Sequence, residues 1–222
     1  MAKAKSKTQW TLYLLLLVEA ALYTLILTGR WVVSAQFASI VLCLAFVVLH
    51  LRRANYFILG ALTCTVCADW FLVVRGGADK VTAMLFFLAA QTLYAILLHR
   101  RVRSRGLLVT RLLAVVAVEA VTVLVLRGGM NELAAVSMAY YVMLAMNILC
   151  AFKGYKKEPL MAWALVLFFI CDTFIGLQTA SGTFLTLPAW LYNVVFCHFN
   201  VAWACYLPSQ VMLAVCGREN RR

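Results

Sequence analysis

The sequence predicts an all-α membrane protein of eight transmembrane helices, on the grounds of its composition, its long apolar runs and the placement of its basic residues. Of the 222 residues, 65% are hydrophobic and 13% are charged, a balance far from that of a soluble globular domain. The apolar runs reach the ~20 residues that a helix needs to cross a hydrocarbon core of ~30 Å. Strands of a membrane barrel would instead alternate over about ten residues. We therefore expect a single integral-membrane domain over residues 1–222.

Short clusters of charged residues separate the apolar runs. The predicted spans are Trp10–Thr28, Trp31–His50, Asn55–Val74, Val81–Leu98, Leu107–Leu126, Leu133–Phe152, Pro159–Leu177 and Ala189–Val215. The first span is not a cleavable signal, because it is too long, carries Glu19 and is followed at once by another span. Pro208 falls inside the last run, where we expect it to kink or end the helix.

The basic residues predict how the helices are oriented. Of the 20 Lys and Arg residues, fifteen fall on one side of the predicted bundle and four on the other, with Arg111 just inside the fifth span. By the positive-inside rule the fifteen lie in the cytoplasm, which places both termini there and requires an even number of spans. In a bacterium the membrane would be the plasma membrane. The net charge of +12 is then mainly a topology signal. No aromatic stacking platform accompanies the cluster at 100–105 to indicate nucleic-acid binding.

An internal repeat indicates two four-helix halves. The triplet Val-Glu-Ala at 18–20 in the first span returns at 118–120 in the fifth span. Asp69 in the third span returns as Asp172 in the seventh, at nearly the same offset. Because four is an even number of spans, the halves 8–105 and 106–216 would have the same orientation. A pseudo-twofold axis along the membrane normal would relate them.

Asp69 and Asp172 are the predicted chemical centre. Each lies within an apolar span, where an aspartate at the middle of an isolated helix costs about 2.5 to 3.5 kcal/mol. Such a residue normally faces the interior of a bundle or a watery cavity. The rise of 1.5 Å per residue places each carboxyl ~20 Å from the cytoplasmic end of its helix. The alternative is that each carboxyl only hydrogen-bonds a neighbouring helix.

Other polar side chains fall at a comparable depth, so one polar belt could hold them all. Gln91 and Tyr94 share a face of the fourth span, which suits them to hold a headgroup or water, or to make an interhelical hydrogen bond. Glu19, Glu119 and His198 also fall near mid-span. A lone histidine in a helix is more often a packing residue than a ligand.

Several other kinds of site are not indicated. Asn193 shares a face of the last span with Cys197 and Asn200, but no group of His, Cys or carboxylate residues has metal-ligand spacing. We therefore expect neither a metal nor a cofactor. The serine-hydrolase motif G-x-S-x-G is missing. Cys64 and Cys67 form a C-x-x-C pair without a βαβ context or a second pair, so we interpret the eight cysteines as small buried hydrophobic residues.

Three segments carry a resemblance to a known family. They read A-D-W-F-L at 68–72, F-L-A-A-Q-T-L-Y at 87–94 and L-F-F-I-C-D-T-F-I-G at 167–176. They are similar to G-D-x-x-L, F-x-x-A-H-x-x-Y and L-F-x-x-S-D-x-x-L-A in the third, fourth and seventh spans of the YhhN family of lysoplasmalogenase-like membrane proteins. The family's sixth span bears a tyrosine, for which Tyr140 or Tyr141 stands here. The resemblance covers most of the chain.

The three segments also depart from the family's motifs. Gln91 stands at the family's histidine, Ala68 at its glycine and Cys171 at its serine. In the last span, Ala202-Trp203 stands where the family has Ala-Gln. If the family's histidine transfers protons during the reaction, Gln91 cannot take over that role. This departure concerns catalytic turnover more than the fold.

The resemblance implies hydrolysis of the vinyl ether bond of lysoplasmalogens, which releases a fatty aldehyde and a glycerophospho-alcohol. Protonating the β-carbon of an enol ether and then adding water requires one protonated carboxyl and one carboxylate. A buried pair of carboxyls suits this, because burial and a neighbouring charge keep one of them neutral. We expect Asp69 and Asp172 to be that pair, in either order. The residues expected to bind or position a lysophospholipid, or another single-chain amphiphile, are Gln91, Tyr94, Glu19, Glu119, Tyr140, Asn193 and His198.

Two other functions fit the same residues. A small-molecule or proton-coupled transporter also has paired halves with intramembrane carboxylates, although the Gly/Pro-interrupted helices of such carriers are not evident here. A non-catalytic relative that only binds a lipid is compatible with Gln91. A closed, lipid-shaped pocket around the two aspartates would favour the hydrolase, and a path open to alternate sides would favour the transporter.

Overall fold

A computed structural model of the chain describes residues 2–29, 32–50, 55–126, 131–156, 159–181, 186–197 and 200–218, with side chains for all of these except 2–8 and 125–126. The described part is built from helices. They are α1 (Ala2–Leu27), α2 (Val32–Leu49), α3 (Tyr56–Asp69), the π-helix η2 (Trp70–Val74), α4 (Lys80–Val102), α5 (Arg105–Leu126), α6 (Glu132–Gly154), α7 (Leu160–Ala180), α8 (Ala189–Val195) and α9 (Val201–Arg218).

Seven of these helices are long and apolar enough to cross a membrane, with η2 counted as part of α3. They coincide with the first seven predicted spans, to within a few residues at each end. The prediction of an all-helical fold with membrane-spanning helices is therefore confirmed. The count of eight spans and the orientation of the termini stay predictions.

The last predicted span, Ala189–Val215, is not one helix. The structure divides it into the short helix α8 and the longer helix α9, with residues 196–200 between them. Asn200 marks the new start, because its side-chain oxygen accepts a hydrogen bond from the backbone N–H of Trp203 at 3.3 Å. Such a capping contact satisfies a donor that the first turn of a helix leaves unpaired.

Pro208 was expected to kink or end the helix; it does not end it, because α9 continues through it to Arg218. A proline in a helix removes the N–H that would bond the carbonyl four residues earlier, here that of Ala204. The hydroxyl of Tyr23 in α1 donates to this carbonyl at 3.2 Å. A neighbouring helix thus supplies the lost hydrogen bond, which is how prolines are accommodated inside membrane helices.

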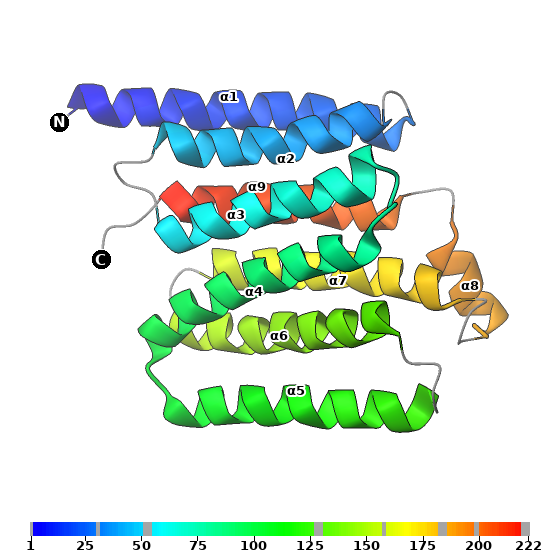
Figure 1. Ribbon diagram of the computed structural model, residues 1–222. Coiled ribbons are helices and arrows are strands. Elements are labelled where there is room, and N and C mark those ends of the chain that lie inside the picture. The colour runs from blue at the N-terminus through cyan, green and yellow to red at the C-terminus, as the bar shows by residue number, and fades with distance from the viewer. Residues whose placement is uncertain are drawn as a thin grey trace.

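The helices lie side by side in one bundle (Figure 1). α3, α4, α7 and α9 form its centre: α3 packs against α4 and α9, and α7 packs against α9. α1 and α2 cover one edge, and α6 and then α5 lie at the other. α1 begins and α9 ends at the same end of the bundle.

Neighbour relations recur in the two parts of the chain. In the first part α1 packs on α2, α2 on α3 and α3 on α4; in the second part α5 packs on α6, α6 on α7 and α7 on α9. Across the parts, α4 packs on α6 and α9 packs on α2. The packing of α3 on α9 has no counterpart between α7 and α4 among the main backbone contacts of the described residues. The two related halves, and their division at 105/106, stay predictions.

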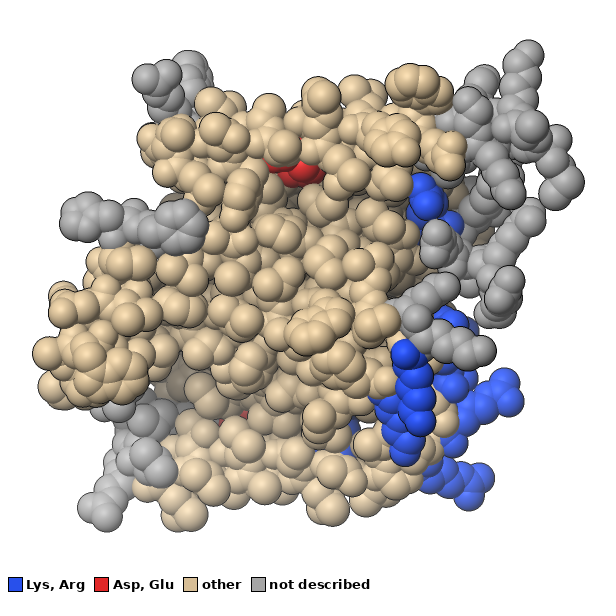
Figure 2. All heavy atoms as spheres, turned by 180° about the vertical axis from the view of Figure 1, so that it is seen from behind, with Lys and Arg blue, Asp and Glu red and all other residues tan. Residues whose placement is uncertain are grey.

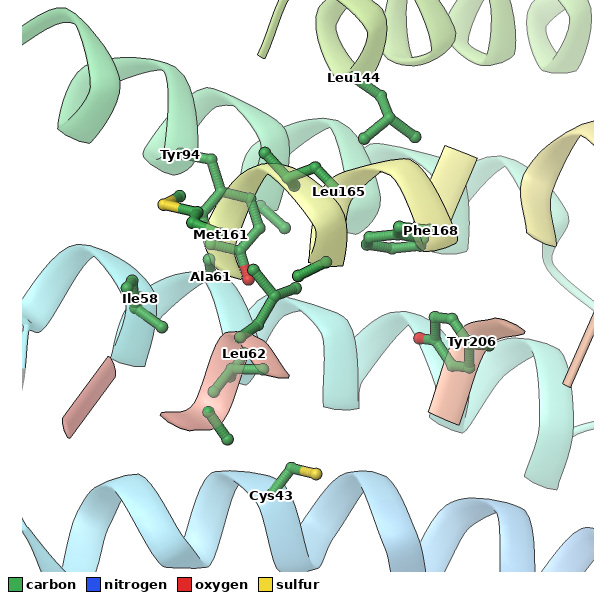
Figure 3. Close-up of a cluster of buried hydrophobic side chains, with 14 of the residues drawn as sticks. Cys43, Ile58, Ala61, Leu62, Tyr94, Leu144, Met161, Leu165, Phe168 and Tyr206 are labelled. Atoms are coloured by element: carbon green, nitrogen blue, oxygen red, sulfur yellow. The ribbon is translucent and has the colours of Figure 1, made fainter. Parts of the chain in front are cut away.

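Small residues let the central helices approach closely. Ala61, Ala90, Ala162 and Ala164 are completely buried, as is usual where membrane helices pack without a hydrophobic driving force. Larger side chains fill the space between them, and Figure 3 shows Tyr94 next to Met161 and Ala61 within this core.

The loop between η2 and α4 shows how the helix ends are fixed. Gly76 and Gly77 lie in the turn after η2 with positive φ angles of 61° and 73°, a region that glycine adopts without strain. Asp79 then caps α4 by accepting from the backbone N–H of Thr82 at 3.0 Å.

Basic side chains gather at one end of the bundle, which we call the basic end (Figure 2). Its described members lie where α4, α6 and α9 end and α5 begins, and they are Arg100, Arg101, Arg103, Arg105, Lys153, Lys156 and Arg218. This is the end that the sequence predicts to be cytoplasmic.

Gly217 provides a test of the packing of α9. A Cβ atom at this position would lie 3.0 Å from Cγ2 of Ile58 and 3.2 Å from Cγ2 of Val47. We expect Gly217→Leu to lower the free energy of unfolding by about 1–3 kcal/mol, the usual cost of overpacking, measured as a lower Tm in detergent. Gly176→Leu is the control, because no atom lies within 4 Å of a Cβ there. Equal Tm values for the two variants would contradict the packing described.

Candidate active site

Asp69 is held by a tyrosine from the far end of the chain. It is the last residue of α3 and is only 3% exposed. The hydroxyl of Tyr206 in α9 donates to Oδ2 of Asp69 at 2.6 Å. A buried carboxyl without a partner is costly, and a phenol is a strong donor that can supply one. This contact joins two helices that are 137 residues apart in the sequence.

The backbone changes its hydrogen-bonding pattern directly after Asp69. Residues Trp70–Val74 form a π-helical turn, and the N–H of Arg75 donates to the carbonyl of Trp70 at 3.0 Å. Single π-turns inside membrane and soluble helices are frequent at functional sites. Here the turn separates the buried carboxyl of Asp69 from the exposed ring of Trp70 on the next residue.

Asp172 has a matching partner. It lies in α7 and is half-buried, and the hydroxyl of Tyr140 in α6 donates to its Oδ2. The thiol of Cys171 makes a second hydrogen bond to the same carboxyl. Asp172 therefore has two donors, while Asp69 has the hydroxyl of Tyr206.

The two carboxyls belong to one site. Asp69 interacts electrostatically with Asp172. Each tyrosine also interacts with the carboxyl that it does not bond, Tyr140 with Asp69 and Tyr206 with Asp172. We call these four residues the Asp–Tyr cluster.

An aromatic wall connects the two halves of the Asp–Tyr cluster. The ring of Phe168 lies 5.3 Å from that of Tyr206 and 5.9 Å from that of Phe87, which in turn lies 5.8 Å from the ring of Tyr140. Figure 3 shows Phe168 on α7 and Tyr206 on α9, both within the buried core. An apolar wall of this kind keeps the local dielectric low and so strengthens the interaction between the carboxyls.

A second pair of polar groups lies beside Asp172. The hydroxyls of Tyr141 and Thr173 are 2.6 Å apart, and both residues are half-buried. Asp172, Tyr141 and Thr173 are thus the partly accessible side of the site, whereas Asp69 on the other side is almost fully buried.

Gln91 and Tyr94 do not contact the aspartates. The side chain of Gln91 is completely buried, and its Oε1 and its backbone carbonyl accept hydrogen bonds from Nδ2 of Asn147 in α6, at 3.0 and 2.8 Å. Gln91 follows Phe87 of the aromatic wall by one helical turn, on the side of the basic end. Tyr94 is buried one turn further, and its hydroxyl has no hydrogen-bond partner within the described residues.

The two glutamates lie elsewhere in the bundle. Glu19 is buried between α1 and α2, where Ser39 donates to it at 2.6 Å and Cys43 at 3.4 Å. Glu119 lies on α5 at the edge of the bundle, and its Oε1 is buried without a described partner. The structure therefore separates both residues from the Asp–Tyr cluster.

Contrary to the prediction from the sequence, the polar residues of the last predicted span do not share one helix face. Asn193 is exposed on α8 and Asn200 is exposed at the start of α9. They do not share a helix face, because the helix is interrupted between them. His198 lies outside the described residues.

Two members of the site were missed by the sequence analysis. Tyr206 gave no signal beyond being a hydroxyl-bearing ring in an apolar run, and Cys171 was noted only as a departure from a motif. Both face the carboxyls because of how α9 and α7 pack together, which no spacing in the sequence reveals.

The ionisable groups of the Asp–Tyr cluster are carboxyls and phenols. Among the described residues, no group of three or more His, Cys, Asp and Glu side chains is close enough to hold a metal ion. What the cluster offers is two carboxyls and two phenols in an apolar surrounding, a set that can donate, accept and stabilise a proton or a developing positive charge.

The fold and the site define a helical multi-pass membrane protein in which two aspartates, one buried and one half-buried, each accept a hydrogen bond from a tyrosine of a neighbouring helix. A model of the YhhN family matches residues 29–216, so the chain belongs to the YhhN family. That family is associated with lysoplasmalogenase activity. Comparisons with curated proteins and with solved structures gave no match.

The contact between Tyr206 and Asp69 can be tested by infrared spectroscopy. Subtracting the spectrum of Asp69→Asn from that of the parent locates the carboxyl band of Asp69. We expect Tyr206→Phe to shift this band and to lower the free energy of unfolding by about 1–3 kcal/mol, because it leaves a buried acceptor without its donor. Tyr192→Phe, on an exposed residue of α8, should change neither. Identical carboxyl bands in the parent and in Tyr206→Phe would show that the contact is absent.

Proposed function

We propose that the protein hydrolyses the vinyl ether bond of lysoplasmalogen-type lipids, with Asp69 and Asp172 as the acid–base pair. The observation that carries this proposal is that two intramembrane carboxyls interact with each other, each held by a tyrosine hydroxyl from a neighbouring helix. Charged residues inside a bundle are costly and are normally functional. The association of the YhhN family with this activity supports the same conclusion.

The reaction has a simple balance. A carboxylic acid donates its proton to the β-carbon of the vinyl ether, which leaves an oxocarbenium ion at the adjacent carbon. The carboxylate stabilises this cation and takes a proton from the water that adds to it. When the resulting hemiacetal collapses, the carboxyl that now holds the water proton gives it to the leaving ether oxygen, and the other carboxylate takes the proton of the hemiacetal hydroxyl. The products are the fatty aldehyde and the glycerophospho-alcohol. One water is consumed, and both carboxyls return to their starting states.

The hydrogen bonds favour one assignment of the two roles. Asp172 accepts from both Tyr140 and Cys171 and is half-buried, so it is the better-stabilised carboxylate. Asp69 has one donor, Tyr206, and is almost fully buried, which suits the acid. The tyrosines hold the two carboxyls in fixed positions, as general acid–base catalysis requires.

A groove on the surface of the bundle suits a single apolar chain. Its volume is about 420 Å³, and it lies between α2 and η2. Phe37, Val41, Trp70 and Val74 are among its lining residues, and Trp70 directly follows Asp69. We propose that the substrate is a single-chain amphiphile whose tail lies along this groove, while its ether bond reaches the Asp–Tyr cluster.

The basic end is the cytoplasmic end in this proposal. The Lys and Arg residues concentrated there agree with the positive-inside rule. With α9 as the eighth span, both termini are cytoplasmic, and in a bacterium the protein lies in the plasma membrane. The aspartates are then nearer the far side of the bilayer than the cytoplasmic side.

A second candidate function is lipid binding without catalysis. The observation that favours it is that Gln91, at the position of the family's histidine, cannot carry a proton, and its amide oxygen already accepts from Asn147. A transporter remains a further alternative, because paired intramembrane carboxyls also serve proton-coupled carriers.

Aldehyde release by two aspartate variants tests the hydrolase. We expect the purified protein to release aldehyde from a lysoplasmalogen and not from its saturated ether analogue. Asp69→Asn and Asp172→Asn should each lower the rate by about 100-fold or more, the usual contribution of a general acid or base. Glu132→Gln, an exposed residue at the start of α6, should retain the parental rate.

The outcomes separate the three functions. If either folded aspartate variant releases aldehyde at the parental rate, the acid–base pair is wrong. If the parent binds the saturated analogue but releases no aldehyde from the lysoplasmalogen, it is a lipid-binding relative. Uptake of a solute into vesicles that depends on Asp69 and Asp172, without aldehyde release, would identify a transporter.

A further inference from the structure

Arg111 is a buried cation without a described carboxylate. It lies in the second turn of α5 and is only 8% exposed. Its Nη2 donates to Oδ1 of Asn147 at 2.9 Å and contacts Sγ of Cys150 at 3.5 Å. Its Nε has no hydrogen-bond partner within the described residues. Burying a guanidinium among neutral groups is costly, and buried charges are normally paired.

A notch in the protein surface lies against this side chain. It is formed where α4 ends and α5 begins, and it is lined by His99, Ser104, Leu108, Arg111 and Cys150, among others. The enclosed space of the notch is about 10 Å³, and the hollow around it, which is open to the outside, is about 210 Å³. The enclosed part has room for about one water molecule. A larger group would therefore lie in the open part of the notch.

The groups around the notch favour an anion. Ser104 is on its wall, with an Oγ that accepts from the N–H of Leu107 at 3.5 Å and so keeps its own proton to donate. The N-terminus of α5 points its backbone N–H groups and its positive dipole end toward the same region. Arg103 and Arg105 are exposed at the rim, and Figure 2 shows that basic side chains dominate this end.

Two other arginines of the basic cluster have different roles. Arg100 lies over the ring of Phe57 at 4.5 Å, and Arg101 lies over the ring of Tyr155 at 4.0 Å. Both guanidinium groups are thus engaged in cation–π contacts. Arg111 is the arginine whose charge is both buried and turned to the notch.

We propose that the notch at Arg111 binds a phosphate group, and that its source is an anionic phospholipid in the leaflet at the basic end. A guanidinium without a described carboxylate suits a phosphate, because its positive charge and N–H donors match the phosphate oxygens. Arg111 lies about 9 Å along α5 from its first residue, so its side chain is within reach of lipid headgroups at that membrane surface.

The notch is separate from the Asp–Tyr cluster. Asn147, which binds Arg111, follows Tyr140 by about 10 Å along α6. A phosphate held here belongs to a second lipid rather than to the substrate whose ether bond lies between the aspartates. The proposal does not depend on the proposed hydrolase, and its test involves no aldehyde release.

Thermal unfolding with three added compounds tests the site. The protein is purified in an uncharged detergent, and its Tm is measured with phosphatidylglycerol, with phosphatidylcholine and with inorganic phosphate. A compound that binds only the folded state raises the Tm in proportion to its occupancy. We expect phosphatidylglycerol to raise the Tm, with an apparent Kd that Arg111→Gln weakens by about 10-fold or more.

Two matched variants make the test specific. Lys153→Gln removes one exposed charge at the same end but outside the notch, and it should retain the parental Kd to within about twofold, as for one screened surface charge. Leu108→Trp narrows the mouth without removing a charge, and it should weaken the binding of phosphatidylglycerol as Arg111→Gln does. If Arg111→Gln fails to fold, the apparent Kd of Leu108→Trp for phosphatidylglycerol tests the site in its place.

Each result has a defined meaning. A Tm rise with phosphatidylglycerol alone supports the lipid source. A rise with inorganic phosphate that Arg111→Gln abolishes, without any effect of the lipid, supports the anion site and overturns the lipid source. An equal rise with phosphatidylcholine, or equal losses in Arg111→Gln and Lys153→Gln, would overturn the site.

Discussion

The structure depends on one constraint, namely that an acidic group buried among apolar helices is costly unless a neighbouring helix supplies a hydrogen-bond donor. In lipid no water competes for these groups, so the bundle itself must satisfy them. The contacts of Tyr206 with Asp69 and of Tyr140 with Asp172 meet this need and also join α3 to α9 and α6 to α7. Each such contact contributes about 0.6–2 kcal/mol to helix association.

The same constraint explains the rest of the polar interior. Glu19 joins α1 to α2 through Ser39, and Asn147 joins α6 to α4 and, through Arg111, to α5. Tyr23 compensates the carbonyl that Pro208 leaves unpaired. These contacts hold the periphery together, whereas the Asp–Tyr cluster combines two acids that interact with each other. This difference is why we propose that the chemistry takes place there.

Much of the fold could be predicted from the sequence because span length and apolar composition are local properties. The seven long helices followed from them, and so did the expectation that Asp69 and Asp172 face the interior of the bundle. The break between α8 and α9 could not be predicted, because residues 189–215 are predominantly apolar and neither Asn193 nor His198, which precede Asn200, is a signal that breaks a helix. The continuation of α9 through Pro208 depends on a hydroxyl from α1, which is a tertiary contact.

The composition of the site was only partly predictable for a related reason. A helix that is apolar all round does not show which face turns inward, so Tyr206 could not be distinguished from other aromatic residues of the last span. The repeat illustrates the same limit. Glu19 and Glu119 share a sequence triplet, yet Glu19 bonds Ser39 and Cys43 while an oxygen of Glu119 has no described partner.

The account's central claim is that Asp69 and Asp172 work as one unit. The most direct measurement is the rate of aldehyde release by the double variant Asp69→Asn/Asp172→Asn, compared with the two single variants under the same conditions. Groups that act together are non-additive, so the account predicts that the double variant is slower than the slower single variant by about threefold at most. Losses that multiply would show that the two carboxyls act independently and would contradict the account.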